Sequence, residues 1–329
     1  MKTIIKKLAG ELPLSLNRTC GTFYCFIQEQ FGQYLTLLNQ VSSSDLESII
    51  IESKEFVGNP SKKRFINLVS KIQSDCLEIL KESYKGDLYT SLEKLKSLLF
   101  SSGPYNNWLV EVIANYFSIS LDSIASDLYR VRDDNKPVED CWNIPFNLRE
   151  KAQDERFNCS GTVCMYLSTS LDCCDKEKGA VAKGHTRYAQ LFRRKDNSIV
   201  PLLDFRVPDE TMCDEMTARD QFCFLILYPF YCLCLTKSSH SSSKEPLFVE
   251  EYLFSRLFFH MLFLHKDNEI CFFDGIIYTS TIDRNAYNIV LPARYSVPEN
   301  DDHNVESPFL RNRLMNIGPP FPIDSVPKE

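Results

Sequence analysis

Apolar residues recur at helical spacing through the first 120 residues of the chain. They fall three or four positions apart with charged residues between them, the pattern of a helix that packs one side inward. The clearest runs are Phe65, Leu68, Val69, Ile72, Cys76, Ile79 and Leu80, then Leu88, Leu92, Leu95 and Leu99, then Leu109, Val112 and Ile113. We therefore predict an all-helical N-terminal domain over residues 1–120, of unknown role.

The character of the chain changes near residue 121, where the apolar runs become short and strand-like. The predicted strands are 127–132, 164–170, 199–207, 222–230, 270–280 and 288–292. Helices are predicted at 171–179 and 248–265. Short strands mixed with few helices predict an α+β fold for residues 121–297. Residues 298–329, rich in Pro, Asp and Asn, are predicted to form an extended C-terminal tail.

Composition and charge narrow the classes of function. The 329 residues, 44% of them apolar, can form one large or two ordinary domains. A net charge of −7 disfavours direct binding to nucleic acid. The longest apolar runs, 222–235 and 252–264, are shorter than the roughly 20 residues of a membrane-spanning helix. We expect neither a nucleic-acid partner nor a membrane anchor.

The cysteines and the N-terminus favour a cytoplasmic protein. Thirteen cysteines are scattered along the chain, unlike the framework of a small disulfide-rich domain. No C-x-x-C pair is matched by a second pair or by histidines at zinc spacing, so we predict no metal site. Lys6, Lys7 and Glu11 interrupt the apolar stretch that a signal peptide would need.

Residues 155–177, ERFNCSGTVCMYLSTSLDCCDKE, carry the first candidate chemistry. Gly161 can form a tight turn, after which Tyr166 lies on a strand and Glu177 about two turns into a helix. An arginine fork such as that of Arg156 suits a pyrophosphate, a tyrosine ring stacks on a base, and a carboxylate stabilises developing positive charge. The alternative is a solvated arginine, a half-buried tyrosine and a surface glutamate. Spacing alone favours that alternative.

Several short motifs that follow one another in a particular order favour the functional interpretation of residues 155–177. LYRVR (128–132), residues 156–177, LLDF (202–205), FDGIIYTS (273–280) and NIVL (288–291) have the order and approximate spacing of the RES-domain family, which this region resembles over about 121–295. The resemblance implies an ADP-ribosyltransferase-like mixed β core and an enzyme that consumes NAD+. Many members of that family are toxins of toxin–antitoxin pairs.

The resemblance assigns roles residue by residue. Arg156, Tyr166 and Glu177 match the family's catalytic positions. Arg130 matches the family's early arginine and Ser280 the serine that closes the DGIIYTS strand, and both would contact NAD+. The polar residues beside the motifs, Asn158 and Asn288, would contact it too. One departure concerns Glu155, which adds negative charge next to the arginine expected to hold phosphate.

The implied reaction is cleavage of the nicotinamide–ribose bond by phosphorolysis or hydrolysis. NAD+ is then the substrate, and inorganic phosphate is one candidate co-substrate beside water. A protein side chain as acceptor would make the enzyme an ADP-ribosyltransferase, and a non-catalytic nucleotide-binding interaction protein is the other alternative. The resemblance also implies a neutralising antitoxin as partner, and the N-terminal helices allow a homo-oligomer.

Overall fold

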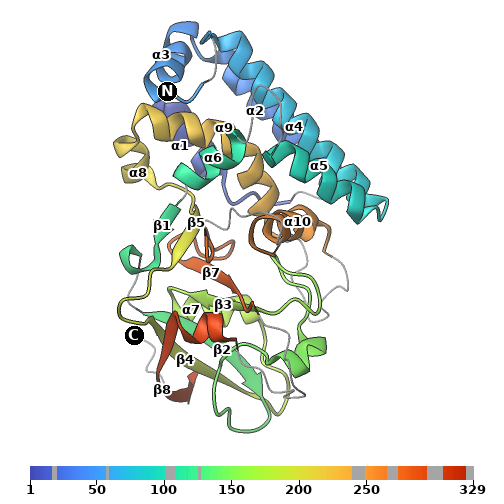
Figure 1. The fold of residues 1–329 in the computed structure, drawn as a ribbon, viewed down its shortest axis with the longest axis vertical. Coiled ribbons are helices and arrows are strands. Elements are labelled where there is room, and N and C mark those ends of the chain that lie inside the picture. The colour runs from blue at the N-terminus through green and yellow to red at the C-terminus, as the bar shows by residue number, and fades with distance from the viewer. Residues whose placement is uncertain are drawn as a thin grey trace. The chain divides into compact units, whose positions relative to one another are not determined.

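The computed structural model describes residues 1–16, 21–56, 59–100, 108–116, 118–124, 127–238, 249–264, 273–294 and 307–323. Over these residues the chain is mixed α and β, which confirms the predicted class at that level (Figure 1). It divides into two compact units. The helical unit comprises Met1–Phe117, Val207–Ser241 and Pro246–Met261, and the sheet unit comprises Ser118–Arg206, Ser242–Glu245 and Leu262–Glu329.

The first part of the helical unit follows the predicted pattern. In α4 the residues at helical spacing are buried, among them Phe65, Val69, Ile72 and Cys76. The helices of this part are α1 (Lys2–Glu11), α2 (Phe23–Gln40), α3 (Ser43–Ser53), α4 (Lys62–Tyr84), α5 (Leu88–Phe100) and α6 (Trp108–Tyr116). Later in the chain come α8 (Glu210–Glu215), α9 (Ala218–Cys234) and α10 (Leu253–Phe259), the last lying within the predicted helix 248–265.

The strand predicted at 222–230 is wrong, because this segment belongs to helix α9. Thr217 and Asp220 form a capping box that starts the helix. Every residue from Gln221 to Cys234 is buried, so the helix is apolar on all sides and shows no helical period in its sequence. In Figure 1 the gold α9 lies among the blue helices from the start of the chain.

A proline inside α9 is accommodated by a neighbouring helix. Pro229 has no N–H to donate to the carbonyl of Leu225, four residues earlier. The hydroxyl of Tyr34, on α2, donates to that carbonyl at 2.5 Å. The ring of Tyr34 also lies 4.6 Å from that of Tyr228, centroid to centroid. The buried carbonyl is thereby satisfied, and α2 is fixed against α9.

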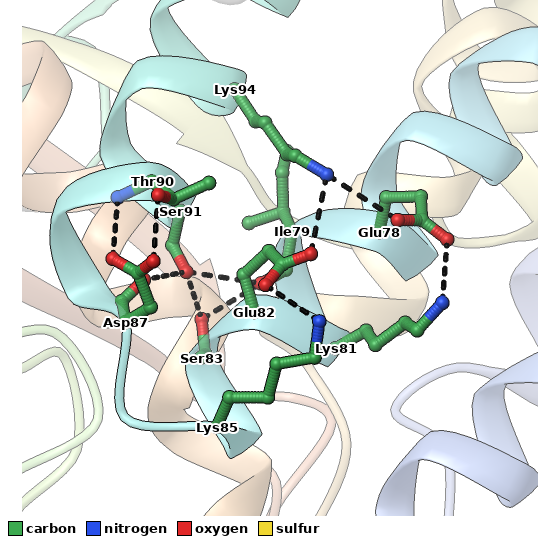
Figure 2. Close-up of polar contacts among 10 residues, drawn as sticks. All are labelled: Glu78, Ile79, Lys81, Glu82, Ser83, Lys85, Asp87, Thr90, Ser91 and Lys94. Atoms are coloured by element: carbon green, nitrogen blue, oxygen red, sulfur yellow. Dashed lines mark hydrogen bonds and ion pairs between the residues drawn. The ribbon is translucent and has the colours of Figure 1, made fainter.

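Polar contacts join α4 to α5 (Figure 2). Asp87, just before α5, accepts from the backbone N–H of Thr90 at 3.0 Å and caps the helix. Inside the hairpin, the buried hydroxyls of Ser83 and Ser91 are 3.0 Å apart. Lys94 bridges two glutamates on the exposed side. Exposed ion pairs contribute little, so the cap and the buried serine pair fix the hairpin more firmly.

The sheet unit is organised around an eight-stranded sheet. Its strand order is β1-β5-β6-β7-β3-β2-β4-β8. Among the described strand pairs, β5 with β6 is parallel and the others are antiparallel. The strands are β1 (Ser118–Ser120), β2 (Leu128–Asp134), β3 (Cys164–Ser168), β4 (Thr186–Arg194), β5 (Pro201–Phe205), β6 (Gly275–Thr279), β7 (Tyr287–Pro292) and β8 (Leu314–Pro322). Helix α7 (Leu171–Lys178) follows β3, and the short α11 (Pro308–Arg311) precedes β8.

The parallel pair explains why the two units are interleaved in sequence. Parallel neighbours need a crossover connection, and the chain between β5 and β6 supplies α8, α9 and α10. These helices belong to the helical unit, so the units differ from the continuous predicted domain over 121–297.

Among the described residues, no helix has both the length and the apolar character needed to cross a membrane.

The extended tail predicted at 298–329 needs correction. The described part, residues 307–323, contains α11 and the edge strand β8, which pairs with β4. Leu310 and Leu314 are fully buried in the core of the sheet unit, and this burial anchors the segment. Prolines such as Pro319 and Pro320 are tolerated because β8 lies at the sheet edge, where a missing N–H breaks fewer ladder bonds. Residues 298–306 and 324–329 lie outside the described residues.

Candidate functional site

One face of the central strands carries polar side chains. Ser168 of β3 lies opposite Asn288 of β7, which lies opposite Tyr278 of β6. Because alternate residues of a strand share a face, one side of these strands carries Tyr166, Ser168, Tyr278 and Asn288. The residues between them pack into the hydrophobic core on the other side: Met165, Leu167, Ile277 and Ile289. Local alternation therefore places these mostly buried polar side chains on the face of the strands opposite the core.

Three of the predicted site residues meet at one carboxylate. The Ser280 hydroxyl donates to Oε1 of Glu177 at 2.6 Å, and the Asn288 side-chain amide donates to the same oxygen at 2.7 Å. Ser280 and Asn288 are buried, whereas Glu177 is exposed. Within the described part of the chain, Oε2 of Glu177 has no hydrogen-bond partner. The carboxylate is thus oriented through one oxygen and presents the other.

Helix α7 carries Glu177 and is anchored at its first turn. Ser170 caps it by accepting from the N–H of Cys173. The Cys173 thiol donates to the Ser280 hydroxyl at 3.2 Å, and the Cys174 thiol donates to the carbonyl of Tyr129 at 3.4 Å. Burial raises the pKa of Cys173 to about 11 and that of Cys174 to about 12. Both are neutral donors at neutral pH and hold the helix rather than act as nucleophiles.

Tyr166 and Asn158 form a second group, which holds the turn before β3. The Tyr166 hydroxyl donates to Oδ1 of Asn158 at 2.8 Å and accepts from the N–H of Phe157 at 3.1 Å. The Asn158 amide nitrogen donates to three backbone carbonyls of the turn, those of Gln153, Cys159 and Thr162. Gly161 has a φ of 79°, which agrees with the predicted turn. The Asn158 side chain is therefore committed to the turn.

The Tyr166→Phe variant is expected to lose stability. The substitution keeps the ring but removes the hydroxyl that donates to Oδ1 of Asn158 and accepts from the N–H of Phe157, at a cost of about 1–3 kcal/mol. Urea unfolding of the two proteins measures the difference. Equal unfolding free energies would contradict the anchoring role of the hydroxyl.

The two arginines belong to the sheet unit. Arg156 is buried in the turn beside Phe157, and Arg130 is half-buried on β2. Nη1 of Arg130 is buried and has no hydrogen-bond partner among the described residues. Burial lowers the pKa of Arg130, with a smaller opposing effect from the charge of Glu155. Glu155 itself is exposed, whereas Arg156 beside it is buried.

The structure joins some predicted residues and leaves others apart. Glu177, Ser280 and Asn288 form one hydrogen-bonded group, and Tyr166 with Asn158 forms another. In the described ranges no hydrogen bond links Arg130 to either group. Sequence reasoning missed the thiol of Cys173 and the strand β4. Buried positions of β4 include Arg187 and Gln190, so no apolar alternation marks that strand in the sequence.

The described residues include no group of three or more His, Cys, Asp or Glu side chains suited to a metal ion. The candidate site residues are a fixed carboxylate, a tyrosine ring, a buried arginine and a half-buried one. Such a set can hold an anion and stabilise a developing cation.

Comparison with known proteins gives one relevant relative. The chain is similar to a protein named putative toxin YopC, from Bacillus subtilis (strain 168). The two are 23% identical over 262 residues, which cover 73% of this chain and 56% of YopC. The chain thus spans a little over half of that relative's length. No protein-family model and no solved structure matches the chain. The similarity fits a toxin and gives no support to the RES-domain resemblance.

Proposed function

We propose that this protein cleaves the bond between nicotinamide and ribose in NAD+, with Glu177 at the reaction centre. The observation that carries the proposal is the carboxylate of Glu177, an exposed residue whose Oε1 is fixed by Ser280 and Asn288 and whose Oε2 has no hydrogen-bond partner among the described residues. As the glycosidic bond lengthens, the ribose becomes oxocarbenium-like and positively charged. A carboxylate already held in place stabilises that charge without having to reorganise.

The other residues supply binding and orientation in this proposal. The ring of Tyr166 packs against the nicotinamide side, and its hydroxyl, bonded to Asn158, fixes the ring angle. Arg130 and Arg156 take the phosphates, where the buried Nη1 of Arg130 gains the partner it lacks within the described residues. Ser280 and Asn288 act mainly by holding Glu177.

The proposal extends to the fold and biological role that the motif resemblance implies. An ADP-ribosyltransferase-like arrangement, a RES-type activity and a toxin restrained by an antitoxin all accord with this site. The toxin name of the Bacillus subtilis relative supports the role of a toxin and does not bear on an antitoxin, an ADP-ribosyltransferase-like fold or a RES-type activity. Water, inorganic phosphate and a protein side chain are the three acceptors under consideration.

Product analysis tests the proposal and names the acceptor. The purified protein is incubated with NAD+, with and without inorganic phosphate, and the products are separated by chromatography and mass spectrometry. We expect free nicotinamide together with ADP-ribose, with its phosphate ester, or with a modified protein. Intact NAD+ after prolonged incubation would refute the proposed function, and saturable binding without products would leave a nucleotide-binding protein instead.

A further inference from the structure

A buried arginine on β4, Arg187, binds the C-terminal end of helix α7. Its contacts with Asp133, Asp175 and Gly179 form a clamp. Nε and Nη2 of Arg187 donate to the two carboxylate oxygens of Asp133, on β2, at 2.6 and 2.7 Å. Nη1 donates to the Asp175 side chain at 2.7 Å, to the Asp175 carbonyl at 2.8 Å and to the Gly179 carbonyl at 3.0 Å. One guanidinium therefore ties the sheet to the last turn of the helix.

The surroundings of this guanidinium favour a permanent ion pair. The Arg187 side chain is only 4% exposed, against 23% for Asp133 and 43% for Asp175. The hydrogen bond with Asp133 is the largest cause that raises the pKa of Arg187, and Asp175 raises it further. A buried charge with two carboxylate partners and fixed geometry resists displacement by water.

The clamp contacts residues on both sides of Glu177, the candidate catalytic carboxylate. Asp175 precedes Glu177 by two residues, and Gly179 follows it by two. The carbonyls near a helix C-terminus lack intrahelical partners, and a cation there also complements the helix dipole. Arg187 supplies both the hydrogen bonds and the charge.

We propose that Arg187 is a positioning residue for Glu177, an inference that rests on the proposed NAD+-cleaving function. Cys173 and Cys174 fix the first turn of α7, and Arg187 with Asp175 fixes the last. Glu177 is exposed and lies in that last turn, so its place over Ser280 and Asn288 depends on the clamp. A displacement of about 1 Å at a reacting group costs roughly 100-fold in rate.

Two variants separate positioning from folding. Asp175→Ala removes the side-chain arm of the clamp on α7 and leaves the paired bonds between Arg187 and Asp133. Arg187→Lys keeps the charge and loses the fork. Arg193→Met is the matched control, because Arg193 lies on the same strand and pairs with Asp127 at 2.6 Å, but both side chains are exposed at 45% and 36%.

Steady-state kinetics of nicotinamide release, with melting temperatures of every variant, give the test. We expect kcat to fall roughly 10- to 100-fold in Asp175→Ala and Arg187→Lys, with KM for NAD+ within about threefold of wild type and Arg193→Met unchanged. A kcat within about twofold of wild type in the folded Asp175→Ala variant would overturn the inference. A fall in kcat that disappears when the rate is expressed per folded molecule would overturn it too. A wild-type protein that releases no nicotinamide refutes the proposed function, and the positioning role with it.

Discussion

Replacing Glu177 with glutamine is expected to lower the rate of nicotinamide release by about 10²–10³-fold, because the charge that stabilises the ribose cation is lost. Glutamine keeps the shape of the side chain, and its carbonyl oxygen can still accept from Ser280 and Asn288. The binding of NAD+ and the free energy of unfolding are therefore expected to change little. Single-turnover rates and isothermal titration calorimetry measure the two effects separately.

Asp172→Asn is the matched control for this substitution. Asp172 lies on the same helix, with a side chain that is 66% exposed and paired with Lys176. We expect its rate to match that of the wild type. An equal loss of rate in both variants would mean that the reaction responds to the charge of α7 as a whole. Unimpaired release by Glu177→Gln would remove Glu177 from the reaction centre.

Replacing Arg130 with methionine is expected to weaken NAD+ binding roughly 10- to 100-fold and yet leave the folded protein as stable as before or slightly more so. The first effect follows from loss of a charge-assisted hydrogen bond to phosphate, worth about 1.5–3 kcal/mol. The second follows because Nη1 is buried without a partner among the described residues, and burying such a group costs free energy that an apolar side chain does not incur.

Titration with ADP-ribose and urea unfolding measure these two effects in the same preparation. Arg132→Met serves as the control, since Arg132 lies on the same strand with a side chain that is 54% exposed. A large loss of stability with unchanged affinity in Arg130→Met would show that the guanidinium has a structural role instead of a binding one.

The sequence predicted those parts of the site that depend on local pattern. The turn at Gly161, the strand with Tyr166 and the helix with Glu177 follow one another within residues 155–177, and each lies where the local residues indicate. Short-range propensities and one glycine suffice for such a unit.

Long-range pairing accounts for what the sequence did not predict. Ser280 and Asn288 are more than 100 residues from Glu177, and they meet it only because β7 pairs with both β3 and β6 in a particular register. The motif resemblance named these residues but did not predict that they bond to the glutamate.

Burial explains why helix α9 was predicted as a strand. The helix is apolar all round, so its sequence lacks the helical period that would have identified it. The contact of Asn158 with NAD+ stays a prediction. In the structure its amide donates to carbonyls of its own turn and its oxygen accepts from Tyr166, contacts that depend on the complete fold.

Proton NMR of NAD+ during incubation with the purified protein tests the central claim most directly, because it identifies the bond that breaks. We expect the anomeric signal of the nicotinamide ribose to disappear as free nicotinamide appears, while the adenosine signals persist. An unchanged spectrum, or cleavage at the pyrophosphate to give AMP and nicotinamide mononucleotide, would contradict the account.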